Sequence, residues 1–266
     1  MSNQSQDPHR QEKLQAFDRL LTIMDELREK CPWDRKQTLK SLRHLTIEET
    51  YELSDAILEE DLEEIKNELG DILLHMVFYA KIASEQKAFH IGDVLHAVAD
   101  KLITRHPHIY GDLEVQDEEE VKRNWEKIKL QENGNRSVLG GVPKSLPALV
   151  KAMRIQEKAR GVGFDWEQKD QVWEKVQEEM KEFLEASNSE DHDAMQNEFG
   201  DVLFSLINYS RFVGINPEEA LETTNKKFIQ RFQFLEDTIK KEGKKIDEMS
   251  LEELDAFWEK AKSANL

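Results

Sequence analysis

The chain has 266 residues, of which 55 are acidic and 37 are basic, so its formal net charge is −18. This charge argues against a broad basic surface for direct nucleic-acid binding, although a bound cation would still allow a phosphorylated small molecule to bind. No apolar run approaches the roughly 18–20 residues that a bilayer span requires, and residues 1–12 are polar, unlike a signal peptide. The single cysteine, Cys31, has no partner for an internal disulfide, which suits a reducing compartment. We therefore expect a cytoplasmic protein without membrane contacts.

The composition is typical of a mostly helical protein, because only 11 glycines and 6 prolines accompany many Glu, Lys and Leu residues. Apolar residues three or four positions apart predict, in chain order, helices over 14–27, 47–65, 67–83 and 90–104. Thr46, with Glu49 three residues later, has the spacing of a capping box, which predicts that the second helix begins there. No stretch shows the alternation of a strand, so we expect an all-α fold.

A break in the middle of the chain predicts two domains. Residues 131–147 contain three glycines and two prolines, which is the composition of a linker. The expected organisation is a helical domain over 1–130, a linker over 131–148 and a second helical domain over 149–266.

The two halves repeat the same motifs. The sequence EETYE at 48–52 corresponds to EEMKE at 178–182, and 20 residues after the first Glu of each, ELGD at 68–71 corresponds to EFGD at 198–201. The further correspondences are Lys101 and Arg105 with Lys227 and Arg231, and the residues WEKIK at 125–129 with WEKAK at 258–262. The simplest account is a tandem duplication in which each unit is a small helical bundle.

The repeated acids predict a metal site in each half. Residues three apart share a helix face, so Glu49 and Glu52 point together, as do Glu68 and Asp71. A single Glu-rich helix is usually a solvated surface. However, the residues after Asp71 are strongly apolar, which places that helix inside a bundle and its acids at least partly out of water. Four converging carboxylates need protons or cations, and oxygen ligands favour Mg²⁺ or Mn²⁺.

Two neighbouring features refine this prediction. A glycine stands between the acids in both halves, at Gly70 and Gly200. Because Gly inside a helix costs about 1 kcal/mol relative to Ala, we expect close packing between helices to compensate for it. A di-iron site would need a Glu-x-x-His pair, but the motif here ends in Asp, and His75 has Ser205 at the equivalent place. We interpret His75 as a packed helix residue.

The basic pairs suit phosphate binding. Lys101 with Arg105, and Lys227 with Arg231, each present two cations one turn apart, which is a common surface pattern that gains meaning beside a carboxylate–metal site. The tryptophans fit base stacking and core packing equally well. Together these features predict a magnesium nucleotide and metal-assisted hydrolysis of a phosphoanhydride, with a metal-free carboxylate accepting the proton from water.

The order EExxE, ExxD and KxxxR in helical units resembles the MazG family of all-α nucleoside triphosphate pyrophosphohydrolases. The sequences CPWD at 31–34 and RHPH at 105–108 look like the first repeat of its two-domain bacterial members, and VGFDW at 162–166 looks like the start of their second repeat. The resemblance implies that an NTP or dNTP is cleaved between the α- and β-phosphates to a nucleoside monophosphate and pyrophosphate, with Mg²⁺. It also implies a homodimer, in which the units pair to complete four-helix bundles.

The resemblance assigns site residues position by position. In the second repeat it implies the metal ligands Glu179, Glu182, Glu198 and Asp201, and the nucleotide contacts Lys175, Lys227, Arg231, Trp258 and Lys262. Glu178 is the acid expected to position water, and together with Glu179 and Glu182 it forms the candidate catalytic set. In the first repeat it implies the metal ligands Glu49, Glu52, Glu68 and Asp71, and the nucleotide contacts Lys101, Arg105 and Trp125.

One departure separates the repeats. The residue equivalent to Lys175 in the first repeat is Leu45, so we expect the second repeat to be the main catalytic site. The residues leave open whether the first repeat is active or mainly structural. The alternatives to an enzyme are a nucleotide- or metal-sensing module without turnover, and a helical scaffold whose acids are merely surface residues.

Overall fold

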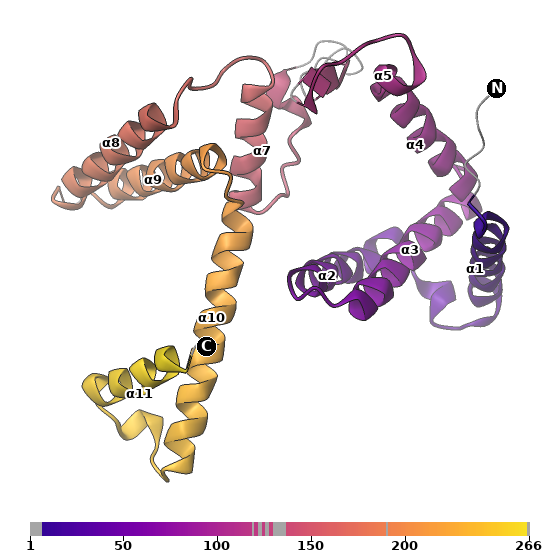
Figure 1. Ribbon diagram of the computed structural model, residues 1–266. Coiled ribbons are helices and arrows are strands. Elements are labelled where there is room, and N and C mark those ends of the chain that lie inside the picture. Colours follow the sequence, from indigo (N-terminus) through magenta and orange to yellow (C-terminus); the bar gives the residue numbers. More distant parts are fainter. Residues whose placement is uncertain are drawn as a thin grey trace. The chain divides into compact units, whose positions relative to one another are not determined.

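The computed structural model describes residues 7–118, 120–121, 124–125, 128–129, 137–189 and 191–264. Within these residues the regular elements are all helices, which confirms the all-α prediction. The chain separates into two compact units, Met1–Glu114 and Val115–Leu266 (Figure 1). Residues 130–136, where the first domain was predicted to end and the linker to begin, lie outside the described residues. Among the described helices, none has the length and apolar character that crossing a membrane would need.

The first unit is built on a helical hairpin. Its helices are α1 (Arg10–Lys30), α2 (Leu39–Leu58), α3 (Leu62–Glu85), α4 (Ile91–Arg105) and the short α5 (Pro107–Tyr110). Helices α2 and α3 lie side by side, and α1 packs on α3 (Figure 1). The buried core draws apolar residues from these three helices, namely Met24, Leu42, Val77, Phe78 and Ile82. Since these residues recur at helical spacing on α3, that helix presents one continuous face to the core.

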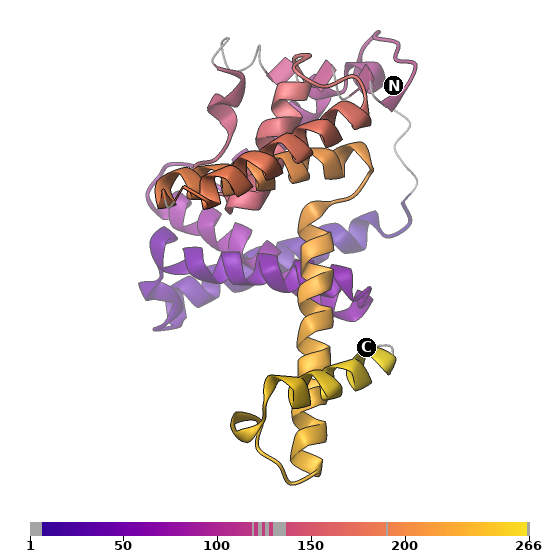
Figure 2. The ribbon, with the colours of Figure 1, turned by 90° about the vertical axis from the view of Figure 1, so that its left-hand side faces the viewer.

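The second unit repeats this hairpin and adds a long arm. Its helices are α7 (Ala148–Arg160), α8 (Lys169–Ser187), α9 (His192–Phe212), α10 (Pro217–Lys241) and α11 (Leu251–Ser263). Helices α8 and α9 lie side by side, whereas α10 leads away from their common end and carries α11 near its far end (Figures 1 and 2). A separate buried cluster of Leu235, Ile239 and Phe257 holds α11 on α10.

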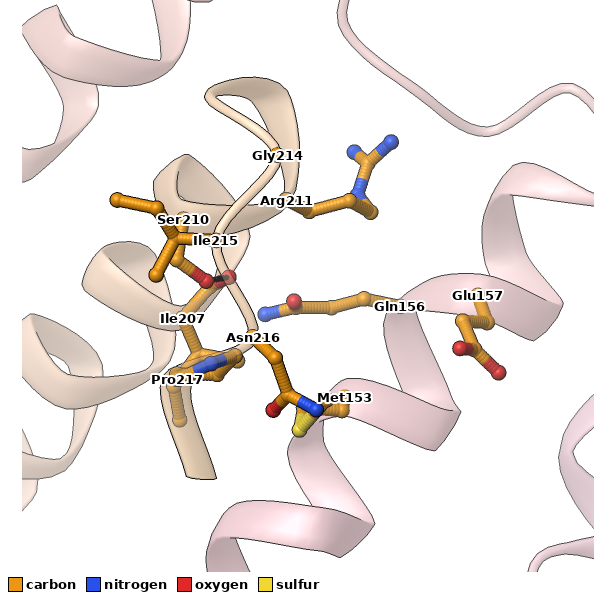
Figure 3. Close-up of a pocket in the computed structure, with 10 residues that line it drawn as sticks. All are labelled: Met153, Gln156, Glu157, Ile207, Ser210, Arg211, Gly214, Ile215, Asn216 and Pro217. Carbon is orange, nitrogen blue, oxygen red and sulfur yellow. Dashed lines mark hydrogen bonds between the residues drawn. The ribbon is translucent and has the colours of Figure 1, made fainter. Parts of the chain in front are cut away.

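The duplication extends to a hollow in each unit. A cavity of about 270 Å³ lies between α7, α9 and the start of α10 (Figure 3). A cavity of about 290 Å³ lies at the matching place in the first unit, between α1, α3 and the start of α4. Gln156 and Ser210 line the second-unit cavity where Met24 and Ala80 line the first. The two units therefore share the arrangement of helices around the cavity, whereas the side chains that line the two cavities differ.

The start of the second helix differs from the prediction. Helix α2 begins at Leu39, because the side chain of Thr38 accepts from the backbone N–H of Ser41 and the Ser41 side chain accepts from that of Thr38. Thr46 lies inside the helix, where its hydroxyl donates to the Leu42 carbonyl at 3.2 Å and lies 2.6 Å from the Tyr79 hydroxyl. A complete capping box earlier in the chain thus sets the start of the helix.

The boundary between the second and third predicted helices was also placed too late. The chain turns at Glu60, whose φ is 55°, and α3 starts directly afterwards because the side chain of Asp61 accepts from the backbone N–H groups of Glu63 and Glu64. Leu62 and Ile65 therefore belong to α3 and not to α2. This earlier start places Glu68 and Asp71 in the second and third turns of α3, and not at its first turn.

Candidate metal and nucleotide site

Each helical hairpin brings acids from its two helices together. In the first unit, carboxylate oxygens of Glu49 on α2 and of Glu68 and Asp71 on α3 all lie within 4.8 Å of one another. In the second unit, Glu179 and Glu182 on α8 and Glu198 on α9 lie within the same 4.8 Å. Each group contains three of the four acids implied for its repeat. The remaining acids, Glu52 and Asp201, are exposed and lie outside these two groups.

The first cluster carries uncompensated negative charge. Burial, followed by the charges of Asp71, Glu52 and Glu68, raises the pKa of Glu49 to about 7. Burial and the same kind of repulsion, from Glu52 and Asp71, raise the pKa of Glu68. Its Oε2 atom is buried and accepts no hydrogen bond from the described residues. Such a carboxylate is costly unless a proton or a cation reaches it.

The second cluster contains its own cation. Glu179 is buried, with 7% of its surface exposed, and its Oε1 lies 2.6 Å from the Nζ atom of Lys175. The same Nζ lies 3.0 Å from Oε1 of Glu178. These two hydrogen bonds raise the pKa of Lys175. Burial and the charge of Glu179 raise the pKa of Glu182, which Lys175 partly offsets. The contact of Lys175 with Glu179 was not foreseen, although their spacing of four residues carried the signal.

The donors in both clusters fit a hard divalent ion. Every candidate ligand atom in the two groups is a carboxylate oxygen, the ligand type that Mg²⁺ and Mn²⁺ prefer over the nitrogen and sulfur ligands of zinc. The unsatisfied Oε2 of Glu68 supplies a buried acceptor that such an ion would satisfy. His75 is buried and Ser205 is equally buried at the equivalent place, so the interpretation of His75 as a packed residue is confirmed.

The glycines do not serve the role predicted for them. A Cβ atom built at Gly70 or Gly200 would meet nothing within 4 Å among the described residues. Neither glycine is therefore required by close packing between helices of one chain, and the expectation of such packing is wrong. Each glycine instead leaves an open helix face beside the acids.

Apart from Lys175 on α8, the predicted nucleotide contacts of the second repeat lie on other helices. Lys227 and Arg231 are on α10, which leads away from the hairpin of α8 and α9 (Figure 1). Trp258 on α11 packs against the buried cluster of α10 and α11, with its ring 5.0 Å from that of Phe228. Nζ of Lys262 donates to Oε1 of Glu259 at 2.5 Å. Within one chain, the α10 pair is thus separate from the acidic cluster.

In the first repeat, Lys101 and Arg105 also lie outside the hairpin of α2 and α3. Lys101 is exposed and Arg105 half-buried, both in the second half of α4. Trp125 is half-buried, and Nζ of Lys129 lies 5.5 Å from the centre of its ring. The described residues therefore place the acids together and the basic pairs elsewhere in both repeats.

The fold and the site define a duplicated all-α chain in which each helical hairpin gathers carboxylates that could hold a divalent cation. The family model described as the MazG nucleotide pyrophosphohydrolase domain matches residues 37–110 and 168–233. These two segments contain both acidic clusters and both Lys/Arg pairs, whereas Trp125, Trp258 and Lys262 lie outside them. The chain belongs to the MazG nucleotide pyrophosphohydrolase family.

Named relatives span the whole chain. The "Nucleoside triphosphate pyrophosphohydrolase/pyrophosphatase MazG" of Thermotoga maritima is 46% identical over 94% of this chain and 96% of its own length. The "Nucleoside triphosphate pyrophosphohydrolase" of Escherichia coli K12 is 39% identical over 94% of this chain and 98% of its own. YabN of Bacillus subtilis, described as uncharacterized, is 48% identical over 96% of this chain and 54% of its own. The prediction of a MazG-family enzyme is confirmed.

Proposed function

We propose that the chain hydrolyses nucleoside triphosphates, both NTP and dNTP, between the α- and β-phosphates and releases a nucleoside monophosphate and pyrophosphate. The observation that carries this proposal is the group of Glu179, Glu182 and Glu198 inside a segment that matches the pyrophosphohydrolase domain. The named activity of relatives that align over nearly the full chain supports it.

Mg²⁺, with Mn²⁺ as a substitute, is the proposed cofactor. Glu179, Glu182, Glu198 and Asp201 would hold it in the second repeat, as Glu49, Glu52, Glu68 and Asp71 would in the first. When bound, such an ion would polarise phosphate oxygens and lower the pKa of a bound water. The two clusters support this choice, since each holds three carboxylates within 4.8 Å of one another, two of which are buried or half-buried.

The other proposed roles belong to residues of the chain. Glu178 is exposed beside Glu179, so it can orient the attacking water and accept its proton. Lys227 and Arg231 lie one turn apart on α10 and can neutralise phosphate oxygens, with Arg offering a bidentate contact. The second repeat is the proposed main site because Lys175 adds a cation there that Leu45 does not provide in the first.

We further propose that the chain acts as a homodimer. Phe199, Leu203 and Leu206 form an exposed apolar stripe on α9. The equivalent positions on α3 are also apolar and exposed, with Leu69 at 52%, Leu73 at 43% and Met76 at 41%. A two-helix hairpin leaves such faces in water, whereas pairing of two hairpins buries them as a four-helix bundle. Because α10 leads away from the hairpin of its own chain, a second copy could also place its α10 against that hairpin.

The dimer is tested with one charged substitution and its control. Leu203→Glu places a charge on the proposed face and should shift the molar mass measured by light scattering from dimer to monomer. Leu251→Glu is the control, because Leu251 is 79% exposed at the start of α11, away from the hairpin. A monomeric wild-type protein, or a Leu203→Glu variant that stays dimeric, would contradict the proposal.

The reaction is tested by product analysis. The full chain is incubated with ATP or dGTP and Mg²⁺, and the products are separated by anion-exchange chromatography. The proposal expects a monophosphate and pyrophosphate in equal amounts. A diphosphate with orthophosphate would contradict the site of cleavage, and nucleotide binding without any product would favour the sensing module.

A further inference from the structure

The two acidic clusters differ most in one position. In the second unit, Nζ of Lys175 lies 2.6 Å from Oε1 of Glu179, an acid of the proposed metal site, and 3.0 Å from Glu178. In the first unit the equivalent residue is Leu45, which is half-buried and packs against the apolar core around Met24 and Leu42. In the second repeat a lysine forms an ion pair with a proposed metal ligand, whereas in the first repeat an apolar side chain stands at the position of that lysine.

The first cluster has no substitute for this lysine. None of the ion pairs found within the described residues joins a lysine or arginine to Glu49, Glu68 or Asp71. Oε2 of Glu68 stays buried and accepts no hydrogen bond from those residues. An ion that reaches the first cluster therefore meets no lysine or arginine of the described residues that it must displace, whereas Glu179 in the second cluster is already paired with Lys175.

We propose that Lys175 is a tethered counter-ion, so that the first cluster binds a divalent metal ion alone while the second binds it together with a polyphosphate. This inference rests on the proposed function of the same two clusters. In the absence of ligand, the ammonium group competes with the metal for Glu179. When a metal–triphosphate binds, Lys175 would exchange Glu179 for a phosphate oxygen, and the freed carboxylate of Glu179 would become available to hold the metal.

The side chain of Lys175 is suited to this exchange. The Lys175 side chain is 36% exposed, whereas the Glu179 side chain is only 10% exposed. The ammonium group therefore has room to change its partner, while the buried carboxylate is held in place by its surroundings. An ammonium on a flexible stem carries three donors and forms point-charge contacts equally well with carboxylate and phosphate. Because the two equilibria are linked, the phosphate must raise the metal affinity of the second cluster by the same factor that the metal raises its phosphate affinity.

The test measures binding of Mn²⁺ to the full-length protein by the loss of the free-ion EPR signal. The first cluster is silenced by Glu49→Gln with Asp71→Asn, so that only the second cluster is read. In that background, Lys175→Leu introduces the residue of the first repeat. We expect the affinity for Mn²⁺ alone to rise about tenfold, because the competing charge is gone. The affinity for Mn²⁺ measured in the presence of an α,β-methylene nucleoside triphosphate, an analogue that cannot be cleaved between the α- and β-phosphates, should fall.

Opposite changes in these two affinities separate a counter-ion from a structural residue. Loss of a merely structural lysine would lower both affinities, and a lysine that only contacts phosphate would leave the affinity for Mn²⁺ alone unchanged. Either result would overturn the inference. Lys175→Met is measured in parallel, and far-UV circular dichroism checks that both variants keep their helices.

A converse measurement separates this inference from the proposed function. With the second cluster silenced by Glu182→Gln and Glu198→Gln, the first cluster should still bind Mn²⁺ without nucleotide, and it should lose this binding when Glu49→Gln is added. If no acid substitution in either repeat reduces Mn²⁺ binding, the proposed metal sites fail altogether. If the acids matter but the first cluster also needs the triphosphate, only the inference on unequal loading fails.

Discussion

Arg211 on α9 donates hydrogen bonds to both carboxylate oxygens of Asp165, with Nη1 lying 2.9 Å from Oδ2. This pair joins the loop before α8 to the far half of α9 and so fixes the entry of the helix that carries Glu179. In the first unit Arg28 on α1 has a comparable role, since it bonds Glu85 and also donates to the Gln37 carbonyl in the loop before α2. Each hairpin is thus anchored by one arginine.

The arginine anchor predicts a stability effect. Both side chains of the Arg211–Asp165 pair are only about 20% exposed, so Arg211→Leu should lower the free energy of unfolding by about 2–3 kcal/mol, mainly because Asp165 loses two charge-assisted hydrogen bonds and keeps only the backbone N–H of Trp166 and a 3.8 Å contact with Arg160. Urea denaturation followed by circular dichroism measures this. The control is Lys181→Leu, which removes an exposed 3.6 Å pair with Glu185 and should cost less than about 0.5 kcal/mol. Equal effects of the two substitutions would contradict the anchor.

The second cluster predicts a loss of turnover without a loss of fold. Glu182→Gln keeps the size and polarity of the side chain but removes a charge from the group with Glu179 and Glu198. We expect kcat to fall by about 100-fold or more, because the metal would lose a charged ligand. Glu185→Gln, on the same helix but outside the cluster, is the matched control and should keep wild-type turnover. Pyrophosphate release under saturating nucleotide is the measurement.

The unequal repeats predict unequal effects of equivalent substitutions. Glu52→Gln, the first-repeat counterpart of Glu182→Gln, should leave most of the turnover, since we expect the second repeat to be the main catalytic site. The ratio of the two kcat values reports how much of the turnover each repeat contributes. If Glu52→Gln abolishes turnover while Glu182→Gln does not, the assignment of the repeats is reversed.

The raised pKa of Glu49 predicts how stability depends on pH in the metal-free chain. Its pKa rises from 4.5 to about 7 on folding, through burial first and the charge of Asp71 next. A carboxyl whose pKa is raised contributes stability that is complete below its unfolded pKa and is lost as the pH rises through 7. With EDTA present, wild type and Glu49→Gln should therefore melt alike at about pH 4, and the variant should melt at the higher temperature at about pH 8.5.

Calorimetry across this pH range checks the sign of the effect. The amide of Glu49→Gln stays neutral at every pH, so the two melting temperatures should separate progressively as the pH rises from about 4.5 and should reach their full difference above pH 7. Added Mn²⁺ should raise the melting temperature of the wild type more than that of the variant, since an ion that binds only the folded state stabilises it. A variant that is less stable than the wild type at high pH without metal would contradict the unfavourable charge at Glu49.

The sequence was informative where a pattern repeats and is local. The shared spacing of EExxE and ExxD was enough to predict that Glu49 meets Glu68 and that Glu179 meets Glu198, because a helical hairpin with a short turn brings those turns together. The start of α2 was mispredicted, because Thr46 has capping-box spacing to Glu49, whereas the actual cap is Thr38 with Ser41 and the Thr46 hydroxyl lies against Tyr79 inside the helix.

Contacts between distant segments were beyond the reach of such patterns. Arg28 and Glu85 are 57 positions apart, and no local spacing signals that pair. The glycines of the ExxD motifs misled for a similar reason, because the sequence does not show whether a glycine lies in a tight contact between helices or on an open helix face. Only the space around Gly70 and Gly200 distinguishes the two.

The most direct test of the carboxylate clusters as metal sites is anomalous diffraction from crystals grown with Mn²⁺ and an uncleavable nucleoside triphosphate. The account predicts Mn²⁺ peaks among Glu179, Glu182 and Glu198, and among Glu49, Glu68 and Asp71. Carboxylates that turn outward to bulk water with no anomalous peak between them, in crystals where the nucleotide is bound elsewhere, would contradict it.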